Sequence, residues 1–381
     1  MVYEFSKRSK LDWIFGRRFK LLASFFVPNR YKKKLLLRER IYYYIPTRFS
    51  WKKLFNLIKT EINIKRNKRK LNSYPYWALI DPCNICNLNC VLCPSGSRKE
   101  LFRTERCMMS VEDFKKIIDE IGEYLFHIVL YNWGEPFLNK KLAEMIKIAN
   151  DRNIGTELST NFQILDETLA EDLVKNGLDR IMISCDGTSQ ETYEKYRKGG
   201  SYDKIIKNIK ILAEAKKKFK SVTPIIDVQF IVFRHNEHEI PETKKFYEYG
   251  ADLVSITRNC LLIPSVIKES MELLPKKEGY DSWEKQFKIN EDGTVSRIPF
   301  TFCPLFYRQI AINPNGDIYP CCGPSHIDGY KFGNFFKNSF MEIWNNQKYQ
   351  DARALNSGIK CDNACGICFT DKWFEEGELQ K

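Results

Sequence analysis

The sequence predicts an α/β protein built on a partial, TIM-like (β/α)6 barrel that is followed by a small, cysteine-rich α+β domain. Three observations lead to this prediction. Short apolar strands alternate with segments of helical period over residues 75–265, a pattern typical of a parallel sheet covered by helices. The alternation stops there, and residues 301–381 carry a compact group of cysteines after a polar linker at 266–300. Residues 1–74 are basic and aromatic, and are expected to form a mostly helical extension.

Composition narrows the class of protein. The chain has 381 residues, of which 43% are hydrophobic, enough for two domains with their own cores. No stretch approaches the roughly 20 apolar residues of a membrane span, and we expect no signal peptide at the amino terminus. The 13 cysteines cluster along the chain instead of spreading through it. This clustering favours metal sites in a reducing cytoplasm over a disulfide framework.

The net charge of +13 is concentrated at one end. Residues 1–70 carry 21 Lys/Arg and 4 Asp/Glu, so this extension is net +17 and the remainder is net −4. Within it, Trp51, Phe55, Ile58 and Ile62 recur at helical spacing. Basic and aromatic residues together suit a peripheral contact with an anionic membrane surface. Two alternatives remain, a helical arm packed on the body or a partner, and, less favoured, a nucleic-acid contact.

The elements of the barrel follow one another regularly. The predicted strands are Trp77–Asp81, His127–Asn132, Gly155–Thr160, Arg180–Cys185, Ile225–Phe233 and Ala251–Thr257. The first predicted helix begins after Ser110. The other predicted helices cover Leu142–Ala149, Leu169–Val174, Tyr202–Lys217 and Ile240–Tyr249. Six units suit an open barrel better than a closed eight-fold one. Sites in such sheets lie at the carboxyl ends of the strands.

The carboxy-terminal region has different signals. Asn313–Asp317 contains Asn, Pro and Gly in a pattern typical of a turn, which predicts a β-hairpin between Gln309–Ile312 and Ile318–Tyr319. Phe340–Tyr349 is predicted as one short helix. We therefore expect a compact α+β unit here.

Three cysteines directly after the first strand mark the candidate active site. Cys86, Cys90 and Cys93 have the spacing C-x3-C-x2-C. A [4Fe-4S] cluster is held by cysteine thiolates, and three ligands leave one iron open to a substrate or cofactor. A structural zinc or iron–sulfur loop is the alternative. Cys83 also forms a C-x-x-C pair with Cys86, but it lies outside the main pattern.

Later strand ends carry further polar motifs. Gly134-Glu135-Pro136 follows the second strand, Ser159 and Asn161 end the third, Ser184 and Asp186 end the fourth, and Arg197 follows. Together with the cysteine loop, this order over residues 76–260 resembles the radical S-adenosylmethionine (SAM) enzymes. Trp133 stands where that family has the first glycine of its Gly-Gly-Glu-Pro motif.

The resemblance implies a role for each residue. Cys86, Cys90 and Cys93 would hold the catalytic cluster, whose open iron binds SAM. Gly134, Glu135 and Pro136 would hold the SAM amino group, and Ser159 and Asn161 its carboxylate or ribose. Ser184 would contact the ribose, Asp186 would shape the turn, and Arg197 would pair with the carboxylate. Taken singly, Gly-Glu-Pro is also an ordinary turn and Arg197 a surface arginine.

The second cysteine group resembles the SPASM/Twitch domains that carry auxiliary clusters. Cys303, Cys321, Cys365 and Cys368 would complete one auxiliary [4Fe-4S] cluster, with Cys322 and Cys361 able to replace a neighbour. A four-cysteine zinc site is the alternative.

The resemblance implies an oxidoreductase-type radical reaction: reductive cleavage of SAM, followed by hydrogen abstraction from a substrate carbon. A flavodoxin or ferredoxin would donate the electron. The basic extension favours a lipid-linked or carbohydrate substrate; modification of a ribosomally made peptide is the alternative. A non-catalytic electron carrier or scaffold is a third hypothesis, but it would not need the ordered strand-end motifs.

Overall fold

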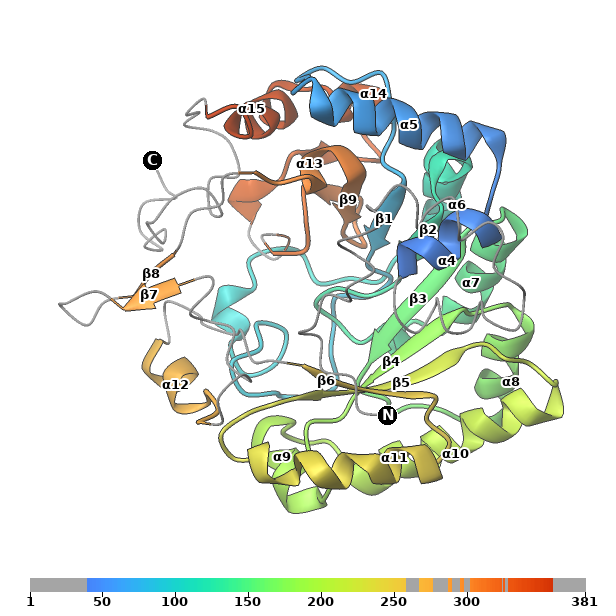
Figure 1. The fold of residues 1–381 in the computed structure, drawn as a ribbon, viewed down its shortest axis with the longest axis vertical. Coiled ribbons are helices and arrows are strands. Elements are labelled where there is room, and N and C mark those ends of the chain that lie inside the picture. Colours follow the sequence, from blue (N-terminus) through green and yellow to red (C-terminus); the bar gives the residue numbers. More distant parts are fainter. Residues whose placement is uncertain are drawn as a thin grey trace, which may run out of the picture.

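The computed structural model describes residues 40–257, 267–276, 287–289, 295–297, 302–323, 325 and 328–358 (Figure 1). Within these residues the main sheet has the strand order β11-β10-β9-β1-β2-β3-β4-β5-β6. Strands β1 to β6 are parallel, as predicted, and the sheet is curved and does not close into a barrel. Their bounds are Trp77–Ile80, His127–Val129, Gly155–Thr160, Arg180–Ser184, Ile225–Ile231 and Leu253–Thr257.

Helices on the outside of the curve connect these strands. They are α6 (Val111–Ile121), α7 (Leu142–Asp151), α8 (Glu167–Lys175), α9 (Gln190–Tyr196), α10 (Tyr202–Lys218) and the mixed segment η4 (Glu237–Lys244) with α11 (Lys245–Glu248). Short 3-10 helices lie in the connections at η1 (Lys99–Leu101), η2 (Gly122–Tyr124) and η3 (Pro136–Leu138). The predicted cap of α6 is present, because the Ser110 hydroxyl accepts the Asp113 amide.

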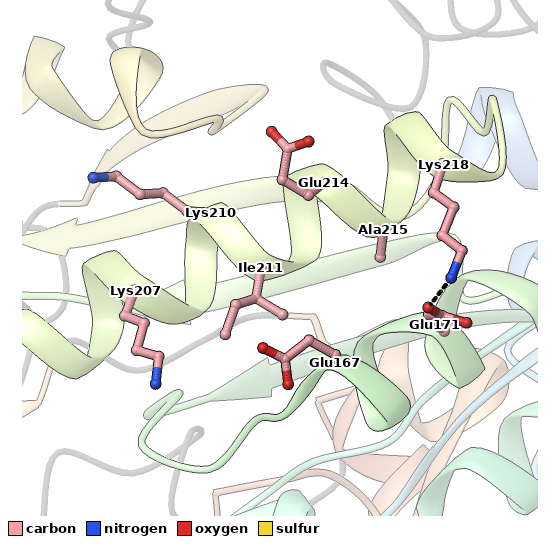
Figure 2. Close-up of a pocket in the computed structure, with 8 residues that line it drawn as sticks. All are labelled: Glu167, Glu171, Lys207, Lys210, Ile211, Glu214, Ala215 and Lys218. Atoms are coloured by element: carbon pink, nitrogen blue, oxygen red, sulfur yellow. Dashed lines mark hydrogen bonds and ion pairs between the residues drawn. The ribbon is translucent and has the colours of Figure 1, made fainter.

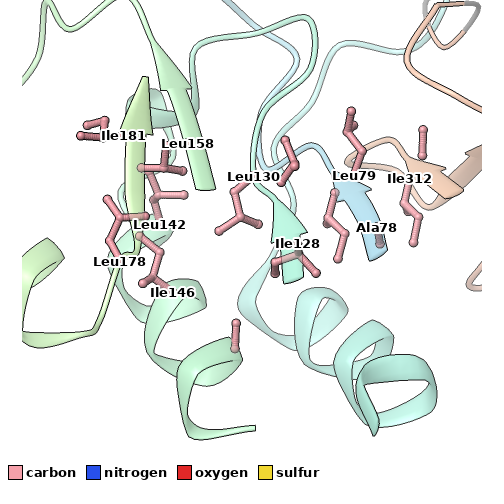
Figure 3. Packing of buried hydrophobic residues seen from close by; sticks show 14 of the residues in the cluster. Ala78, Leu79, Ile128, Leu130, Leu142, Ile146, Leu158, Leu178, Ile181 and Ile312 are labelled. Carbon is pink, nitrogen blue, oxygen red and sulfur yellow. The ribbon is translucent and has the colours of Figure 1, made fainter. Parts of the chain in front are cut away.

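The core lies between the sheet and these helices (Figure 3). Ile128 and Leu158 point from β2 and β3 toward Leu142 and Ile146 of α7, and Ile181 of β4 is equally buried. Burying a Leu or Ile side chain contributes about 1.5–3 kcal/mol each, so this layer holds the strand ends in fixed positions. Among the described residues, no helix has both the length and the apolar content needed to cross a bilayer.

The predicted hairpin of the carboxy-terminal region extends the barrel sheet. Strand β9 (Gln309–Ile312) pairs in parallel with β1, and β10 (Asp317–Tyr319) and β11 (Gly333–Asn334) continue the sheet in antiparallel fashion. The turn requires glycine at Gly316, where φ is +83° and a Cβ would lie 2.4 Å from the Phe336 ring. The two cysteine-bearing regions therefore share one continuous sheet.

Helices of this region pack beside the hairpin. They are α13 (Leu305–Arg308), α14 (Phe340–Trp344) and α15 (Gln347–Leu355), with η7 (Asp328–Tyr330) between the strands. The prediction of one helix over Phe340–Tyr349 is wrong, because Asn345 binds Leu71 through its side chain and Asn346 caps a new helix. The predicted linker contains α12 (Ile267–Glu272) and an unpredicted antiparallel pair, β7 (Phe287–Ile289) and β8 (Val295–Arg297).

Two helices of the amino-terminal extension, α4 (Arg40–Thr47) and α5 (Trp51–Lys65), cover the amino-terminal ends of the strands. Arg48 donates to both oxygens of Asp179, just before β4, at 3.0 and 2.9 Å. In α5, Glu61 accepts from Arg308, just before β9, and from the Tyr76 hydroxyl just before β1. These two helices thus cover the end of the barrel opposite the cysteine loop.

Candidate active site

The cysteine loop leaves the carboxyl end of β1 and folds back on itself. A Cβ at Gly96 would lie 2.8 Å from the Cys90 amide nitrogen, so glycine allows the loop to close tightly. Cys90 is buried against Leu88, Tyr196 and Phe233, and Cys86 and Cys93 pack against the same cluster. The structure therefore brings the three predicted cluster ligands to one place at the mouth of the barrel.

The end of α9 holds this loop from one side. The Asn89 amide donates to the Lys198 carbonyl and the Val91 amide to the Tyr196 carbonyl, both at 3.0 Å. The Tyr196 ring stacks on Phe233 with 4.3 Å between ring centroids. Backbone hydrogen bonds on a packed aromatic base restrict where the cysteine side chains can lie.

The Gly-Glu-Pro segment holds the loop from the other side. The Glu135 amide donates to the Ile85 carbonyl at 2.8 Å. A Cβ at Gly134 would lie 1.9 Å from the Cys83 carbonyl oxygen and 2.6 Å from the Asn84 Cα, so no side chain fits there. Gly134 is thus required for the close approach of the two backbones.

The Glu135 carboxylate is buried and accepts three hydrogen bonds from the protein itself. Thr160 Oγ1 and the Phe137 amide donate to one oxygen at 2.6 and 3.1 Å, and the Asn161 amide donates to the other at 2.7 Å. Burial raises the pKa of Glu135 to about 7, although these donors oppose the shift. The carboxylate therefore ties the second strand end to the third.

Asn161 extends from the end of β3 to the cysteine loop. Its side-chain amide donates to Asn87 Oδ1 at 2.8 Å and lies 3.8 Å from Cys86 Sγ. Ser159 lies two residues earlier, half-buried and in register with Met182 of β4. The predicted third strand end is therefore beside the first cysteine.

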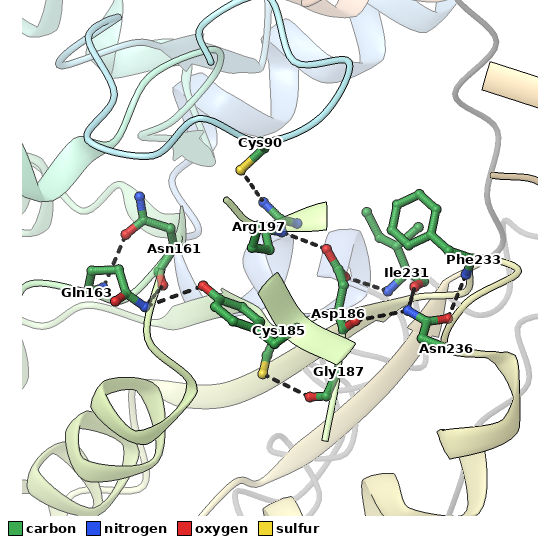
Figure 4. Close-up of polar contacts among 11 residues, drawn as sticks. Cys90, Asn161, Gln163, Cys185, Asp186, Gly187, Arg197, Ile231, Phe233 and Asn236 are labelled. Atoms are coloured by element: carbon green, nitrogen blue, oxygen red, sulfur yellow. Dashed lines mark hydrogen bonds and ion pairs between the residues drawn. The ribbon is translucent and has the colours of Figure 1, made fainter. Parts of the chain in front are cut away.

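Arg197 and Asp186 connect the fourth strand end to Cys90 (Figure 4). Arg197 Nε donates to Asp186 at 2.6 Å, and Arg197 Nη1 lies 4.0 Å from Cys90 Sγ. The other Asp186 oxygen accepts the Ile231 amide at 2.8 Å. Burial alone would lower the pKa of Arg197, but Asp186 and Cys90 hold it well above its usual value. Ser184 is buried at the end of β4, two residues before Asp186, in register with Gln229 of β5.

Two residues that sequence reasoning did not single out complete the arrangement. Asp81 is fully buried after β1 and accepts the amides of Cys83 and Trp133 at 3.3 and 3.4 Å, joining the two loops. Burial raises its pKa to about 7. Asn236 donates to the carbonyls of Asp186 and Ile231, both at 2.9 Å (Figure 4). An aspartate at a strand end was the available signal for Asp81; Asn236 carried none.

The predicted auxiliary ligands are only partly covered by the structure. Cys303 is buried before α13, where its backbone exchanges two hydrogen bonds with the Asn356 side chain. Cys321 follows β10 and is half-buried. Cys365 and Cys368, like Cys361, lie outside the described residues, so the four-thiolate set stays a prediction.

Trp133 links the mouth to the carboxy-terminal cysteine segment. Its indole nitrogen donates to Ser325 Oγ at 2.9 Å and lies 3.2 Å from the Cys322 carbonyl oxygen. Asn132 also contacts the Ser325 hydroxyl. The bulky residue at the first glycine position of the motif thus serves as a contact between the two regions.

Among the described residues, no group of three His, Cys, Asp or Glu side chains is arranged around a single metal ion. A cluster does not require this, because its cysteine ligands bind different irons. The groove of roughly 540 Å³ in Figure 2 lies between α8 and α10. It is lined by lysines and glutamates, including the Lys218–Glu171 ion pair, and contains none of the predicted site residues.

Comparison with known proteins identifies two domains in the chain. Residues 80–247 match the model of the radical SAM superfamily, and residues 303–369 match SPASM, an iron–sulfur cluster-binding domain. An AdoMet-dependent heme synthase of Methanosarcina barkeri is 23% identical over 325 residues, 74% of this chain and 85% of its own. A PqqA peptide cyclase of Granulibacter bethesdensis is 25% identical over 300 residues, covering 72% and 76%.

The fold also matches solved structures. The crystal structure of Streptococcus suis SuiB bound to S-adenosylmethionine superposes with a TM-score of 0.56 at 18% identity, covering 80% of this chain and 72% of SuiB. The radical SAM domain binds a [4Fe-4S] cluster and SAM, and the SPASM domain binds auxiliary iron–sulfur clusters. The chain therefore contains a radical SAM domain over residues 80–247, followed by a SPASM domain over residues 303–369.

Proposed function

We propose that Cys86, Cys90 and Cys93 hold the catalytic [4Fe-4S] cluster and that the strand ends around them bind SAM. The observation that carries this proposal is the convergence of three later segments on one loop. Glu135 reaches it through Ile85, Asn161 through Asn87, and Arg197 lies beside Cys90. When bound, the cluster and SAM supply one-electron chemistry that removes a hydrogen atom from a substrate carbon.

The residues at the mouth suit an anionic cluster. N–H groups of Asn161 and Leu88 lie 3.8 and 3.5 Å from Cys86 Sγ, and a guanidinium nitrogen of Arg197 lies 4.0 Å from Cys90 Sγ. Burial raises the pKa of the Cys86 thiol to about 12, so cluster binding would release a proton there. N–H donors and a cation directed at the sulfurs stabilise thiolates at this otherwise apolar position.

We assign the remaining residues according to the groups they can offer. The backbone of Gly134–Pro136 would receive the SAM amino group, whereas the Glu135 carboxylate orients the Thr160–Asn161 turn. Arg197 would bind the SAM carboxylate through its guanidinium edge while Asp186 fixes its direction. Ser159 and Ser184 would contact the ribose or carboxylate from neighbouring strands.

The auxiliary cluster is assigned to Cys303, Cys321, Cys365 and Cys368. Four thiolates leave no open iron, which suits electron transfer or support of the substrate wall. The contacts of Trp133 with Ser325 and the Cys322 carbonyl support a cluster region close to the catalytic mouth. A flavodoxin- or ferredoxin-type donor would supply the electron, since radical SAM enzymes generally take electrons from such donors. We place the reaction in the cytoplasm, where these thiols stay reduced.

For the substrate, we propose a lipid-linked or carbohydrate metabolite, because a basic, aromatic extension precedes the barrel. A peptide substrate is the second candidate, and the similarity to a PqqA peptide cyclase favours it. Deuterium-labelled candidates of each class distinguish the two. Only a true substrate transfers deuterium into the 5′-deoxyadenosine that the reduced enzyme releases, and transfer from peptides alone would reject the lipid-linked class.

Electron paramagnetic resonance tests the site assignment. The reduced, anaerobically reconstituted protein should give a [4Fe-4S]⁺ signal that shifts when SAM is added. Replacing Cys86, Cys90 or Cys93 by Ala should abolish the SAM-dependent shift, whereas Cys83→Ala should retain it, because Cys83 Sγ faces the Ile85 carbonyl. A shift that survives Cys90→Ala would reject the assignment.

A further inference from the structure

The outward side of α5 is apolar along its whole length. Trp51, Phe55, Ile58 and Ile62 are 65%, 61%, 44% and 43% exposed, the largest such set on one element of the described chain. Their spacing of four, three and four residues places them on one stripe, which we call the α5 outer face. The side chains that α5 buries include polar ones, so the helix presents its most apolar side to solvent.

This orientation is held by specific bonds. The Asn56 side chain exchanges hydrogen bonds with the Tyr74 backbone at 3.0 and 2.8 Å, and Lys53 donates to the Asn153 carbonyl at 2.6 Å. Arg308 binds both oxygens of Glu61 at 2.8 and 2.6 Å. Rotating α5 to bury its outer face would break all of these bonds, so that face can be covered only from outside.

The surroundings of the outer face are cationic. The exposed charged residues of 51–70 are all basic: Lys52, Lys59, Lys65, Arg66, Lys68, Arg69 and Lys70. Glu61 is the one acidic residue in this segment, and Arg308 and Tyr76 engage it. Lys52 is paired with Glu123. A surface on which aromatic and aliphatic side chains lie beside mostly positive charges is complementary to an anionic, partly apolar layer.

We propose that the α5 outer face docks this protein on the surface of an anionic lipid bilayer. Trp and Phe favour the interfacial region, Ile58 and Ile62 favour hydrocarbon, and the lysines and arginines attract acidic headgroups. Single-stranded nucleic acid fits less well, because it needs a row of stacking rings and half of this stripe is aliphatic.

A second copy of the chain and the amino-terminal segment are poor occupants for reasons of charge. A second copy would bring two sets of these cations together. Residues 1–39 carry 11 Lys/Arg against 3 Asp/Glu, so this segment is repelled as well. An acidic bilayer meets both the apolar and the electrostatic requirement.

The docking face and the cysteine loop lie at opposite ends of the strands. Through Glu61 and Lys53, α5 contacts segments just before β9, β1 and β3, whereas the loop follows the carboxyl end of β1. A docked molecule would therefore hold the mouth of its barrel away from the bilayer, separated from it by strands of three to seven residues. At about 3.3 Å per residue, this separation favours substrates with a long headgroup or chain over a buried acyl chain.

Vesicle sedimentation of the full-length protein tests the proposal. We expect binding to vesicles with about 30% phosphatidylglycerol and none to pure phosphatidylcholine. The double variant Phe55→Ser/Ile58→Ser should lose at least about tenfold in partitioning to the acidic vesicles. The matched control is Val222→Ser, since Val222 is 66% exposed away from α5, and it should bind like the wild type.

Two results would contradict docking through the α5 outer face. Equal binding by the wild type and the double variant would overturn the proposal, because attachment would then run through another part of the chain. Binding of a single-stranded oligonucleotide without binding to vesicles would overturn it as well. Iron content and SAM cleavage are measured on the same preparations. These should be unchanged in both variants, so a failure of docking is distinguishable from a failure of the proposed catalytic function.

Discussion

Replacing Gly134 by alanine tests whether the Gly-Glu-Pro segment positions the cysteine loop. An ideal Cβ would lie 1.9 Å from the Cys83 carbonyl oxygen and 2.6 Å from the Asn84 Cα. Ordinary contact is roughly 3.5 Å, so one of the two backbones must move by about 1.5 Å. Because these atoms are backbone, no rotamer change relieves the clash.

The magnitude follows from this displacement. Overpacking of this kind costs about 1–3 kcal/mol in the free energy of unfolding. A misplacement of about 1 Å at a reacting site can also reduce the rate by about 100-fold. We therefore expect Gly134→Ala to fold, to bind less iron after reconstitution, and to release 5′-deoxyadenosine from SAM about 100-fold more slowly.

The control for this variant is Gly122→Ala. A Cβ at Gly122 would lie 3.1 Å from the ends of the Ile118 and Ile154 side chains, which can adjust. Its iron content and rate should stay close to those of the wild type. Wild-type iron content and rate in Gly134→Ala would refute the reasoning, since the loop would then tolerate the movement.

Three further predictions concern single side chains. Glu135→Gln turns an acceptor into a donor facing the Asn161 amide, and should lower the free energy of unfolding by about 1–3 kcal/mol in urea titrations; no change would contradict the hydrogen-bond assignment. Burial and Arg48 lower the pKa of Lys53 to about 8, below the unfolded value of about 10.4. Between these pH values the unfolded chain therefore binds more protons than the folded one. The free energy of unfolding of the wild type should rise with pH by about 3 kcal/mol relative to that of Lys53→Met. A difference between the two proteins that does not change with pH would exclude a lowered pKa at Lys53. Arg197→Lys cannot keep the fork between Asp186 and the SAM carboxylate, so calorimetry should show SAM affinity at least about tenfold weaker, and unchanged affinity would count against the role of Arg197.

The barrel strands were predictable because their local signals agree with their environment. Gly155–Thr160 was predicted with the bounds observed for β3, because it falls between two predicted helices of the alternating pattern. Long-range pairing had no such signal. The parallel pairing of Trp77–Ile80 with Gln309–Ile312 joins segments more than two hundred residues apart, and nothing in either segment encodes the partner.

The extension shows a different limit. Helical spacing of Trp51, Phe55, Ile58 and Ile62 correctly predicted a helix, but not which side faces the body. The buried side contains Asn56 and Thr60, because both bind the Tyr74 carbonyl. Specific hydrogen bonds to a neighbouring backbone outweigh the apolar pattern there.

At the candidate site, the order of the motifs along the chain was enough to predict where they lie, but not which side chains bond to one another. The cysteine loop, Gly134–Pro136 and Asn161 follow successive strands, so their meeting at one mouth follows from the topology. The pairing of Arg197 with Asp186 and of Trp133 with Ser325 depends on side-chain directions that spacing does not contain.

Reductive cleavage of SAM tests the central claim most directly. The anaerobically reconstituted protein, reduced with dithionite, should convert SAM to 5′-deoxyadenosine and methionine. Cys83→Ala should retain this activity and Cys90→Ala should lose it. Of these two cysteines, only Cys90 packs with the side chains of the C-x3-C-x2-C loop. No 5′-deoxyadenosine from a wild-type preparation with a full complement of iron and sulfide would contradict the account.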